Sequence, residues 1–256
     1  MKCKISCIII ALFIITTSYA QQFISKASIE YEVVSNIQKT MSNMFWMQDL
    51  KDKLPTFKTG YYTFTFADDK SIYKFDHWDE QSRKIPDFLK KGDEENVWYS
   101  DYNSGKLNMQ KNIWGSNVNV EDSIRKLNWK ITNESRIIAG FNCRKAVSVM
   151  FDSVYVFAFY TDEILIPGGP CSINGLPGMI LGVTIPRLYT SWIATKIMVT
   201  NVDESVIKPL HAKKNLTLTD LKSTIIDHTK EWYDDDETLN KEIQQQKVRT
   251  LWGTLL

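Results

Sequence analysis

The sequence predicts a mainly β fold with a few helices. This is an α+β arrangement in which a strongly curved antiparallel sheet or half-barrel has helices near its N- and C-terminal ends. Short runs of alternating apolar and polar residues recur between turn residues, which is the pattern of antiparallel strands. Aromatic residues are frequent, with 8 Trp, 11 Tyr and 12 Phe, and they favour pleated sheets. Helical spacing occurs only near the two ends of the region expected to fold.

The composition is that of an ordinary globular protein. Hydrophobic residues make up 43% of the 256 residues and charged residues 24%, which excludes a disordered or collagen-like chain. The 31 basic residues nearly balance the 30 acidic ones. Because no basic field is present, we expect no nucleic-acid partner.

The first twenty residues have the pattern of a secretory signal peptide. Lys2 and Lys4 supply a positive start, and an almost wholly apolar run follows at 5–15. The small residues Ser18 and Ala20 then precede a cleavage point. The alternative is a retained membrane anchor, but the apolar run is too short to span a bilayer. We therefore expect an exported protein.

The predicted domain organisation is a signal peptide over 1–20 and a single β-rich domain over 21–256. The C-terminal segment of this domain, about 219–252, is expected to be helical. Removal of the signal leaves 29 basic and 30 acidic residues and a net charge of −1. No later apolar stretch is long enough for a transmembrane helix.

The folded region is expected to begin with a strand and then a helix. Residues 28–34 alternate between apolar and polar, as a half-buried strand does. Ser35 and Gln38 have the spacing of a capping box, which predicts a helix from this point. Pro55 ends the helical pattern.

Strands dominate the middle of the chain. A hairpin is predicted from strands at 61–66 and 71–75 joined by a turn at 67–70. The charged segment 79–96 lacks periodicity and is interpreted as a solvated loop. Further strand patterns occur at residues 97–102, 107–111, 127–132, 136–139, 144–151, 154–160, 178–185 and 191–202. The run 154–160 is apolar on both faces, which predicts a central strand covered on both sides.

Two helices are expected at the C-terminal end. Residues 220–233 have an apolar face at helical spacing, with Thr219 as the predicted N-cap. The acidic run 234–237 opens a last helix that extends to about Leu251. Acidic side chains at a helix start interact favourably with the helix dipole.

Two cysteines, Cys143 and Cys171, remain after the signal peptide. In an exported protein this pair predicts one disulfide. Such a bond would constrain the unfolded chain by roughly 3–4 kcal/mol. The alternative is two unpaired buried thiols. A metal site is a poor fit, since no histidines lie nearby in the sequence.

A segment dense in turn residues at 163–181 surrounds Cys171. Pro177 and Gly178 suit the two central positions of a type II turn, where Gly supplies the positive φ. The turn is functional if its free backbone N–H groups form an exposed anion-binding loop. It is structural if it only connects strands and is held by the disulfide.

This segment also carries a resemblance to a known family. The turn itself reads Gly175, Leu176, Pro177, Gly178, Met179 and Ile180. It resembles the signature of the GLPGLI family, with Met179 where the family name has leucine. The resemblance extends over most of the mature chain through the runs 29–32, 129–131, 138–146, 160–164 and 169–170.

The resemblance implies an exported protein of the Bacteroidota. The implied location is a Gram-negative envelope: the periplasm, the outer-membrane surface or the cell exterior. The family has no established activity and no assigned catalytic residues, so the resemblance implies no active site.

Other candidate sites carry weaker signals. Met41, Met44 and Met47 share a helical stretch and would suit a soft metal such as Cu(I) or a lid over an apolar groove. Methionine also fills gaps in ordinary cores. His77 lies among the carboxylates of 76–80, but a second histidine ligand is missing nearby. The acidic run at 234–237 lacks the spacing of a calcium loop. We therefore assign no catalytic, cofactor-binding or metal-binding residue and expect no cofactor.

The sequence favours a non-enzymatic envelope module that binds a partner protein or an apolar small molecule on the concave side of its sheet. No Gly-x-Ser-x-Gly or His-Glu-x-x-His motif is present. One alternative is an envelope hydrolase that gathers His77, His211 or His228 with a carboxylate and a serine. The others are a carrier of lipids or other apolar ligands and a structural role in outer-membrane assembly, which predicts a large exposed apolar patch.

Overall fold

The computed structural model describes residues 24–41, 53–151, 153–232 and 237–256. The predicted signal peptide lies outside these residues, as do Met44 and Met47. The prediction of a mainly β fold with a few helices is confirmed.

One open antiparallel sheet of eleven strands organises the described residues. Its order is β6-β5-β4-β3-β2-β1-β11-β10-β9-β8-β7, so β6 and β7 form the two edges. The strands are β1 Lys26–Asn36, β2 Phe57–Ala67, β3 Lys70–Trp78, β4 Val97–Asp101, β5 Lys106–Ile113, β6 Ser116–Ser123, β7 Lys130–Ile138, β8 Phe141–Met150, β9 Val154–Thr161, β10 Met179–Ile185 and β11 Thr190–Met198.

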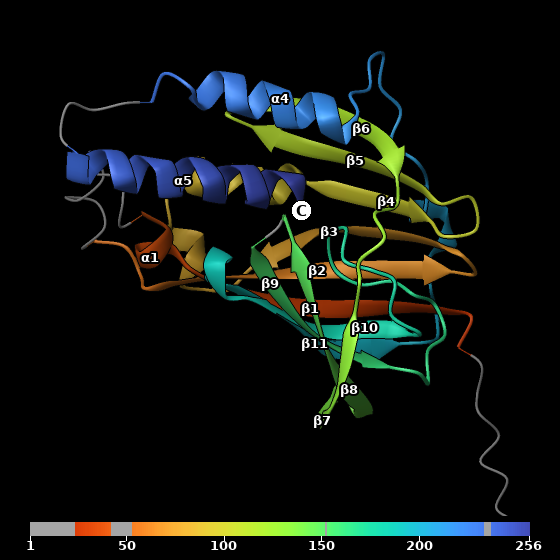
Figure 1. Cartoon of the computed structure of the whole chain (residues 1–256). Coiled ribbons are helices and arrows are strands. Elements are labelled where there is room, and N and C mark those ends of the chain that lie inside the picture. The colour runs from red at the N-terminus through yellow and green to blue at the C-terminus, as the bar shows by residue number, and fades with distance from the viewer. Residues whose placement is uncertain (1–23, 42–52, 152, 233–236) are drawn as a thin grey trace, which may run out of the picture.

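The longer helices, α4 and α5, lie near the C-terminal end of the chain. The described α-helices are α1 Ile37–Met41, α3 Lys91–Glu95, α4 Leu218–Thr229 and α5 Glu237–Leu255, and short 3-10 turns are η2 Ser82–Lys84, η3 Asp87–Leu89, η4 Pro186–Leu188 and η5 Glu204–Val206. Figure 1 shows α4 and α5 running side by side over the upper part of the molecule.

The first strand joins the two halves of the sheet. β1 pairs with β2 on one side and with β11 on the other. Its alternate residues Ala27, Ile29, Tyr31 and Val33 are buried, which confirms the predicted strand at 28–34. Because each half is built from strands adjacent in sequence, β1 is the strand through which the two halves pair.

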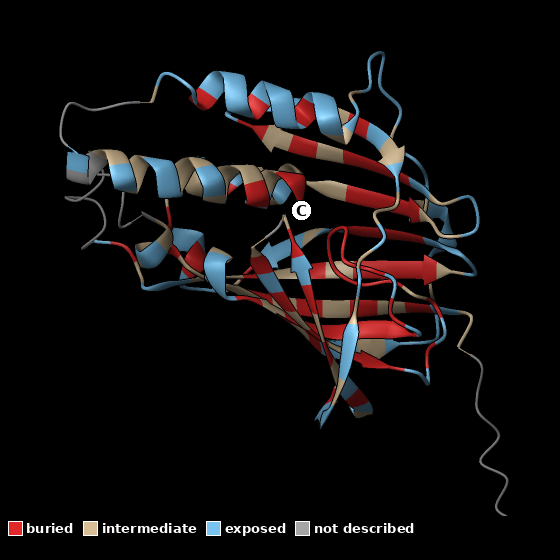
Figure 2. Cartoon of the chain, in the orientation of Figure 1, coloured by how far each residue is buried: buried red, intermediate tan, exposed pale blue. Residues whose placement is uncertain are grey.

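Aromatic side chains fill the core above the central strands. The Tyr31 ring meets Phe64 and Tyr73 edge-on, with ring centroids 6.4 and 6.1 Å apart. The Tyr31 hydroxyl donates to the carbonyl oxygen of Ile180 at 2.6 Å, which satisfies its one polar atom. Figure 2 shows buried residues along the central strands and at the C-terminal end of α5.

The start of the first helix differs from the prediction. Ser35 belongs to β1, and its hydroxyl lies 3.0 Å from that of Thr190 on β11. The side chain of Asn36 instead accepts from the Lys39 backbone N–H at 2.9 Å. Pairing of β1 with β11 thus extends the strand past the residue that suits a helix cap.

The segment 79–96 is not the solvated loop that its charge predicts. It contains η2, η3 and α3, and Ser82, Ile85 and Lys90 are buried. Trp78 donates its indole N–H to Glu94 at 2.5 Å, which fastens α3 against the sheet. Long charged side chains can cover apolar surface. The high charge of this segment therefore does not make it a solvated loop.

The strand prediction also differs from the observed sheet at β6, β7 and β9. The two strands expected at 127–132 and 136–139 are one strand, β7, with an irregular register against β8. The sequence pattern does not predict β6. β9 is buried on its inner face only, and on its outer face Arg136 lies 3.8 Å from the Phe159 ring centroid. The apolar run 154–160 predicts a second layer of protein over this outer face, but cationic side chains cover it instead.

Helix α4 begins earlier than predicted. Thr217 rather than Thr219 is the N-cap, because Thr217 and Asp220 form a reciprocal capping box. Leu221 and Ile225 are buried, as the predicted apolar face requires. Within the described residues, no helix is both long and apolar enough to cross a bilayer.

Candidate functional site

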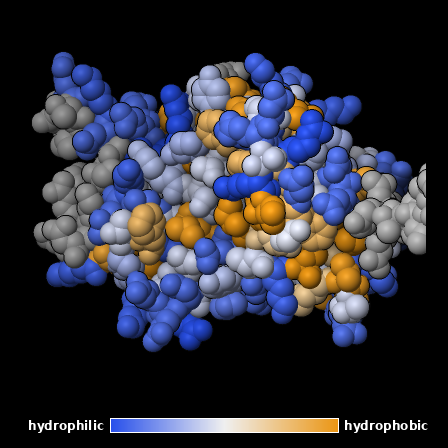
Figure 3. All heavy atoms as spheres, turned by 90° about the horizontal axis from the view of Figure 1, so that it is seen from below, coloured by the Kyte–Doolittle hydropathy of each residue, from blue (hydrophilic) through white to orange (hydrophobic). Residues whose placement is uncertain are grey.

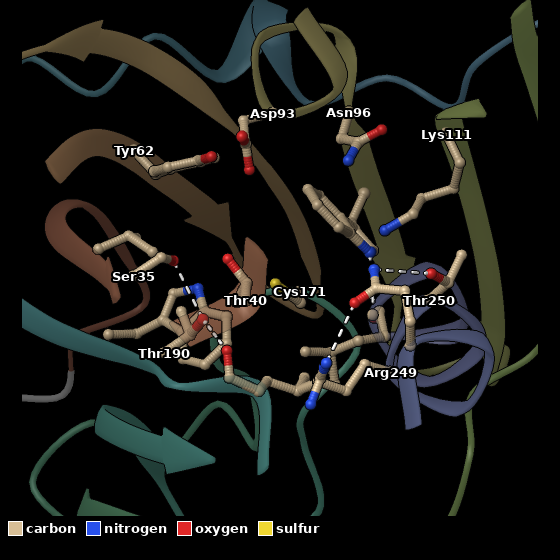
Figure 4. A pocket seen from close by; sticks show the side chains of 17 residues that line it. Ser35, Thr40, Tyr62, Asp93, Asn96, Lys111, Cys171, Thr190, Arg249 and Thr250 are labelled. Carbon is tan, nitrogen blue, oxygen red and sulfur yellow. Dashed lines mark hydrogen bonds between the residues drawn. The ribbon is translucent and has the colours of Figure 1, made fainter. Parts of the chain in front are cut away.

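A cavity of about 260 Å³ lies where the sheet meets the C-terminal end of α5. Side chains from β1, β2, β4, β5 and β11 form its sheet wall, and α3 and the loop around Cys171 contribute as well. Gln246, Arg249, Thr250 and Gly253 of α5 line it together. Their spacing places them on one helix face. Figure 4 shows these groups converging from elements far apart in sequence.

Lys111 is the most unusual residue of the cavity. It is only 3% exposed, and its Nζ atom lies 4.3 Å from the centroid of the Trp98 ring. Among the described residues no carboxylate forms an ion pair with it. Burial lowers the pKa of Lys111 to about 8, and the nearby Cys171 and Asp93 oppose this shift.

The position of Lys111 follows from the alternation of β5. Leu107, Met109, Lys111 and Ile113 are buried on the same face of that strand. The sequence signal for this site is therefore a lysine at a position where the alternation of the strand calls for an apolar residue. The predictions made from the sequence did not include Lys111.

Arg249 supplies a second cation. Its Nε atom is buried without a hydrogen-bond partner among the described residues. One terminal nitrogen donates to the Gln246 side chain at 3.1 Å. Burial lowers the pKa of Arg249, and Tyr189 opposes the shift. Arginine nevertheless stays charged at neutral pH.

Asp93, the one acidic side chain among the residues that line the cavity, is already paired. Asp93 forms an ion pair with Lys58, and Lys58 also donates to the carbonyl oxygen of Leu89 at 2.9 Å. The main-chain carboxyl group of Leu256 also lines the cavity and accepts from Trp98 and Ser172. Among the described residues, neither Lys111 nor Arg249 forms an ion pair.

The remaining wall is amphipathic. Val33, Trp98, Leu188 and Trp192 present apolar surface. The Trp98 indole N–H donates to a main-chain carboxyl oxygen of Leu256 at 3.2 Å, which ties the end of α5 to β4. A ligand here would meet both aromatic surface and positive charge.

The predicted disulfide does not form. Cys143 and Cys171 are both free and buried. Cys143 lies on β8, whereas Cys171 lies in the cavity beside Trp192 of β11. β9 and β10 lie between β8 and β11. Three strand spacings of about 4.8 Å amount to roughly 14 Å, which exceeds the reach of a disulfide. Burial raises the pKa of Cys143 to about 11 and that of Cys171 to about 12, so both are protonated thiols.

The family-like turn at 175–180 lies outside the cavity lining. Gly178 has φ 147°, and a Cβ atom there would lie 2.0 Å from the Thr161 carbonyl oxygen. Its N–H donates to the Leu176 carbonyl at 2.8 Å, which makes the turn tighter than the type II turn expected. The N–H groups of Gly175, Met179 and Ile180 also donate within the protein. These bonds favour a structural role over an anion-binding loop.

The three histidines contact different groups. His77 pairs with Asp76 at 2.7 Å, and His228 stacks on Trp114 with centroids 3.8 Å apart. His211 lines a separate cavity of about 340 Å³ with Asp101 and other residues. Within the described part of the chain, no three His, Cys, Asp or Glu side chains are placed to hold a metal ion. The structure thus brings no two of these histidines into one site.

Exposed apolar side chains occur on the outer surface of the β7–β9 end of the sheet. Those from this region and the loop after β9 include Ile131, Ile137, Val149, Tyr155 and Leu165. Figure 3 shows apolar residues gathering on the face seen from below, among polar ones.

Comparison with known proteins gives fold similarity only. No protein-family model matches the chain, and no curated protein matches it either. Among solved structures, PNGF-II in the P21 space group matches with a TM-score of 0.52, 14% identity and coverage of 78% of this chain and 33% of that chain. PNGF-II in the C2 space group matches with a TM-score of 0.49 and 16% identity, and the match covers 86% of this chain and 33% of that chain. An uncharacterized conserved protein from Thermus thermophilus matches with a TM-score of 0.37 and 9% identity, and the match covers 75% of this chain and 90% of that chain. The chain spans about a third of the length of PNGF-II.

Proposed function

We propose that this chain is an exported, non-enzymatic binding module of the GLPGLI type whose cavity holds a small molecule with an apolar body and an anionic group. The observation that carries the proposal is the pair Lys111 and Arg249. Lys111 is almost fully buried and the Nε atom of Arg249 is buried in one amphipathic cavity. Neither cation forms an ion pair among the described residues. Burying an uncompensated charge costs several kcal/mol, which a bound anion would offset.

A carboxylate is the anion that suits these groups best. The guanidinium of Arg249 has a planar fork that matches two carboxylate oxygens. The indole rings of Trp98 and Trp192 supply apolar surface for the rest of the molecule. In this proposal the cavity side is the concave side of a strongly curved sheet.

The size of the cavity favours a small ligand over a membrane lipid. Its volume of about 260 Å³ lies below the roughly 300–1,000 Å³ of most ligand pockets. A lipid carrier therefore agrees less well with this site. A hydrolase finds less support, because the histidines do not share a cavity.

The proposed location is the envelope of a Gram-negative cell or its exterior. Support comes from the signal-like residues 1–20 and from the resemblance at 175–180. Fractionation of the native host with N-terminal sequencing tests this part. We expect an exported chain that begins at Gln21, and a cytoplasmic chain that retains its leader would contradict it.

A tryptophan-fluorescence titration tests the binding proposal, because Trp98 and Trp192 line the cavity. We expect hexanoate to bind at least about tenfold more tightly than hexanol, since hydrogen bonds to charged groups contribute about 1.5–3 kcal/mol. Lys111→Met and Arg249→Gln should each weaken hexanoate binding.

Lys145→Met is the matched control for this titration. Lys145 also lies over an aromatic ring, at 5.5 Å from the Phe157 centroid, but it pairs with Glu134 and lies outside the cavity. Equal binding of hexanoate and hexanol, or equal loss in all three variants, would contradict the proposal.

A further inference from the structure

We propose that Lys111 captures the carbonyl group of a small oxo acid as a reversible imine, while Arg249 holds the carboxylate of the same molecule. This inference rests on the proposed function and names the ligand class of that site. It adds a covalent step that simple anion binding does not require.

The first support is the position of the Lys111 amine. The side chain enters the cavity from β5 and Arg249 enters it from α5, as Figure 4 shows. The Nζ atom lies over the Trp98 ring and donates to no acceptor among the described residues. A neutral amine here would have its electron pair free to attack a carbonyl carbon.

The second support is the charge environment. The other ionisable groups on the cavity wall are Asp93 from α3, Tyr62 from β2, Cys171 from its loop, Arg249 from α5 and the main-chain carboxyl group of Leu256, which accepts from Trp98. Asp93 is held by Lys58, and burial keeps Tyr62 and Cys171 protonated by raising their pKa values. None of them holds the proton of Lys111 in place.

Burial makes the amine available near physiological pH. With a pKa of about 8, roughly a quarter of Lys111 is neutral at a pH of about 7.5, against about a thousandth of an ordinary lysine. Desolvated lysines in apolar pockets act as nucleophiles toward carbonyl compounds for this reason.

The proposed step balances without an oxidant or reductant. The neutral Nζ attacks the carbonyl carbon, and a proton moves from nitrogen to oxygen to give a carbinolamine. Uptake of one proton expels water and leaves a protonated imine. Overall, one ammonium and one carbonyl give one iminium and one water. The positive charge therefore stays above the Trp98 ring, where the ring face favours a cation.

The test uses the full chain with glyoxylate, the smallest oxo acid, and sodium cyanoborohydride as the trapping reagent. Reduction of the imine leaves one carboxymethyl group on the lysine, which intact-mass measurement and peptide mapping locate. We expect Lys111 to be labelled about tenfold faster than Lys145 or more, because its neutral fraction is far larger. Lys111→Arg should lose this label.

Arg249→Gln tests the second half of the proposal. It should slow labelling of Lys111 by dilute glyoxylate and leave labelling by acetaldehyde, which has no carboxylate, unchanged. Peptide mapping of the unmodified chain identifies the labelled lysine even if a variant does not fold.

The outcomes separate this inference from the proposed function. Labelling spread evenly over the lysines, together with normal hexanoate binding, would overturn the imine and leave the binding module intact. Absence of both Lys111 labelling and hexanoate binding would overturn the two together.

Discussion

The Nζ atom of Lys111 lies 4.3 Å from the centroid of the Trp98 ring, with the lysine almost fully buried. The ring face compensates the ammonium only in part, because a cation–π contact contributes about 0.5–2 kcal/mol. Loss of water around a charge costs more than this. The cavity therefore holds a charge that has no ion-pair partner among the described residues.

Replacement of Lys111 by methionine should stabilise the empty protein. Lys111→Met removes the buried charge and keeps a side chain of similar length, so we expect a gain of about 1–3 kcal/mol in the free energy of unfolding at neutral pH. Urea denaturation of both proteins measures it. A loss of several kcal/mol would show that the charge is already compensated.

The stability difference should depend on pH with a defined sign. The folded-state pKa of Lys111 is about 8 and the ordinary value 10.5, so the unfolded chain binds the extra proton between these values. Unfolding free energy therefore rises with pH from about 8 to 10.5. The advantage of Lys111→Met should shrink over this window, and the comparison cancels groups that both proteins share and that do not interact with Lys111. A constant difference would contradict the shifted pKa.

Gly178→Ala should destabilise the protein severely. An added Cβ would meet the Thr161 carbonyl oxygen at 2.0 Å, so we expect a loss of about 3 kcal/mol or more. Gly115→Ala is the control, because Gly115 also has a positive φ but no atom within 4 Å of an added Cβ. It should cost only about 1 kcal/mol. Equal losses in thermal denaturation would show that the close approach to Thr161 is not decisive.

The two thiols should remain unmodified in the native protein. Cys143 and Cys171 are buried and protonated, and the thiolate is the reactive form. Iodoacetamide should label both peptides only after addition of guanidinium. Detection of a Cys143–Cys171 peptide in unreduced protein would contradict the structure and restore the disulfide.

The start of α4 can be tested by a pair of threonine substitutions. Thr217→Ala removes the capping box and should cost about 1 kcal/mol. Thr219→Ala, at the exposed position that the sequence pattern favoured, should change stability little. The reverse order in urea denaturation would move the helix start to Thr219.

Strong periodicity made much of the fold predictable. β1 and the hairpin of β2 and β3 follow alternation along the sequence, and their buried residues repeat every second position. The elements that were missed depend on distant contacts. Ser35 is drawn into β1 by Thr190, and β6 combines weak alternation with polar residues. The local sequence pattern does not show which distant residues such segments pair with.

The candidate site was far less predictable. Lys111 stands at a buried position of an apolar alternation, a signal that the printed sequence contains. Arg249 and Trp192 are brought to it only by the way α5 and β11 meet β5. The disulfide was predicted from the compartment inferred for the chain. That inference does not depend on the fold, in which strands separate Cys143 from Cys171.

Calorimetric titration of hexanoate at a pH of about 7 and about 9.5 tests the central claim most directly. If the charge of Lys111 holds the ligand, affinity should fall about tenfold at the higher pH as that charge is lost, and Lys111→Arg, which stays charged, should show no such fall. The same dissociation constant at both values for the unmodified protein would contradict a cavity built around this lysine.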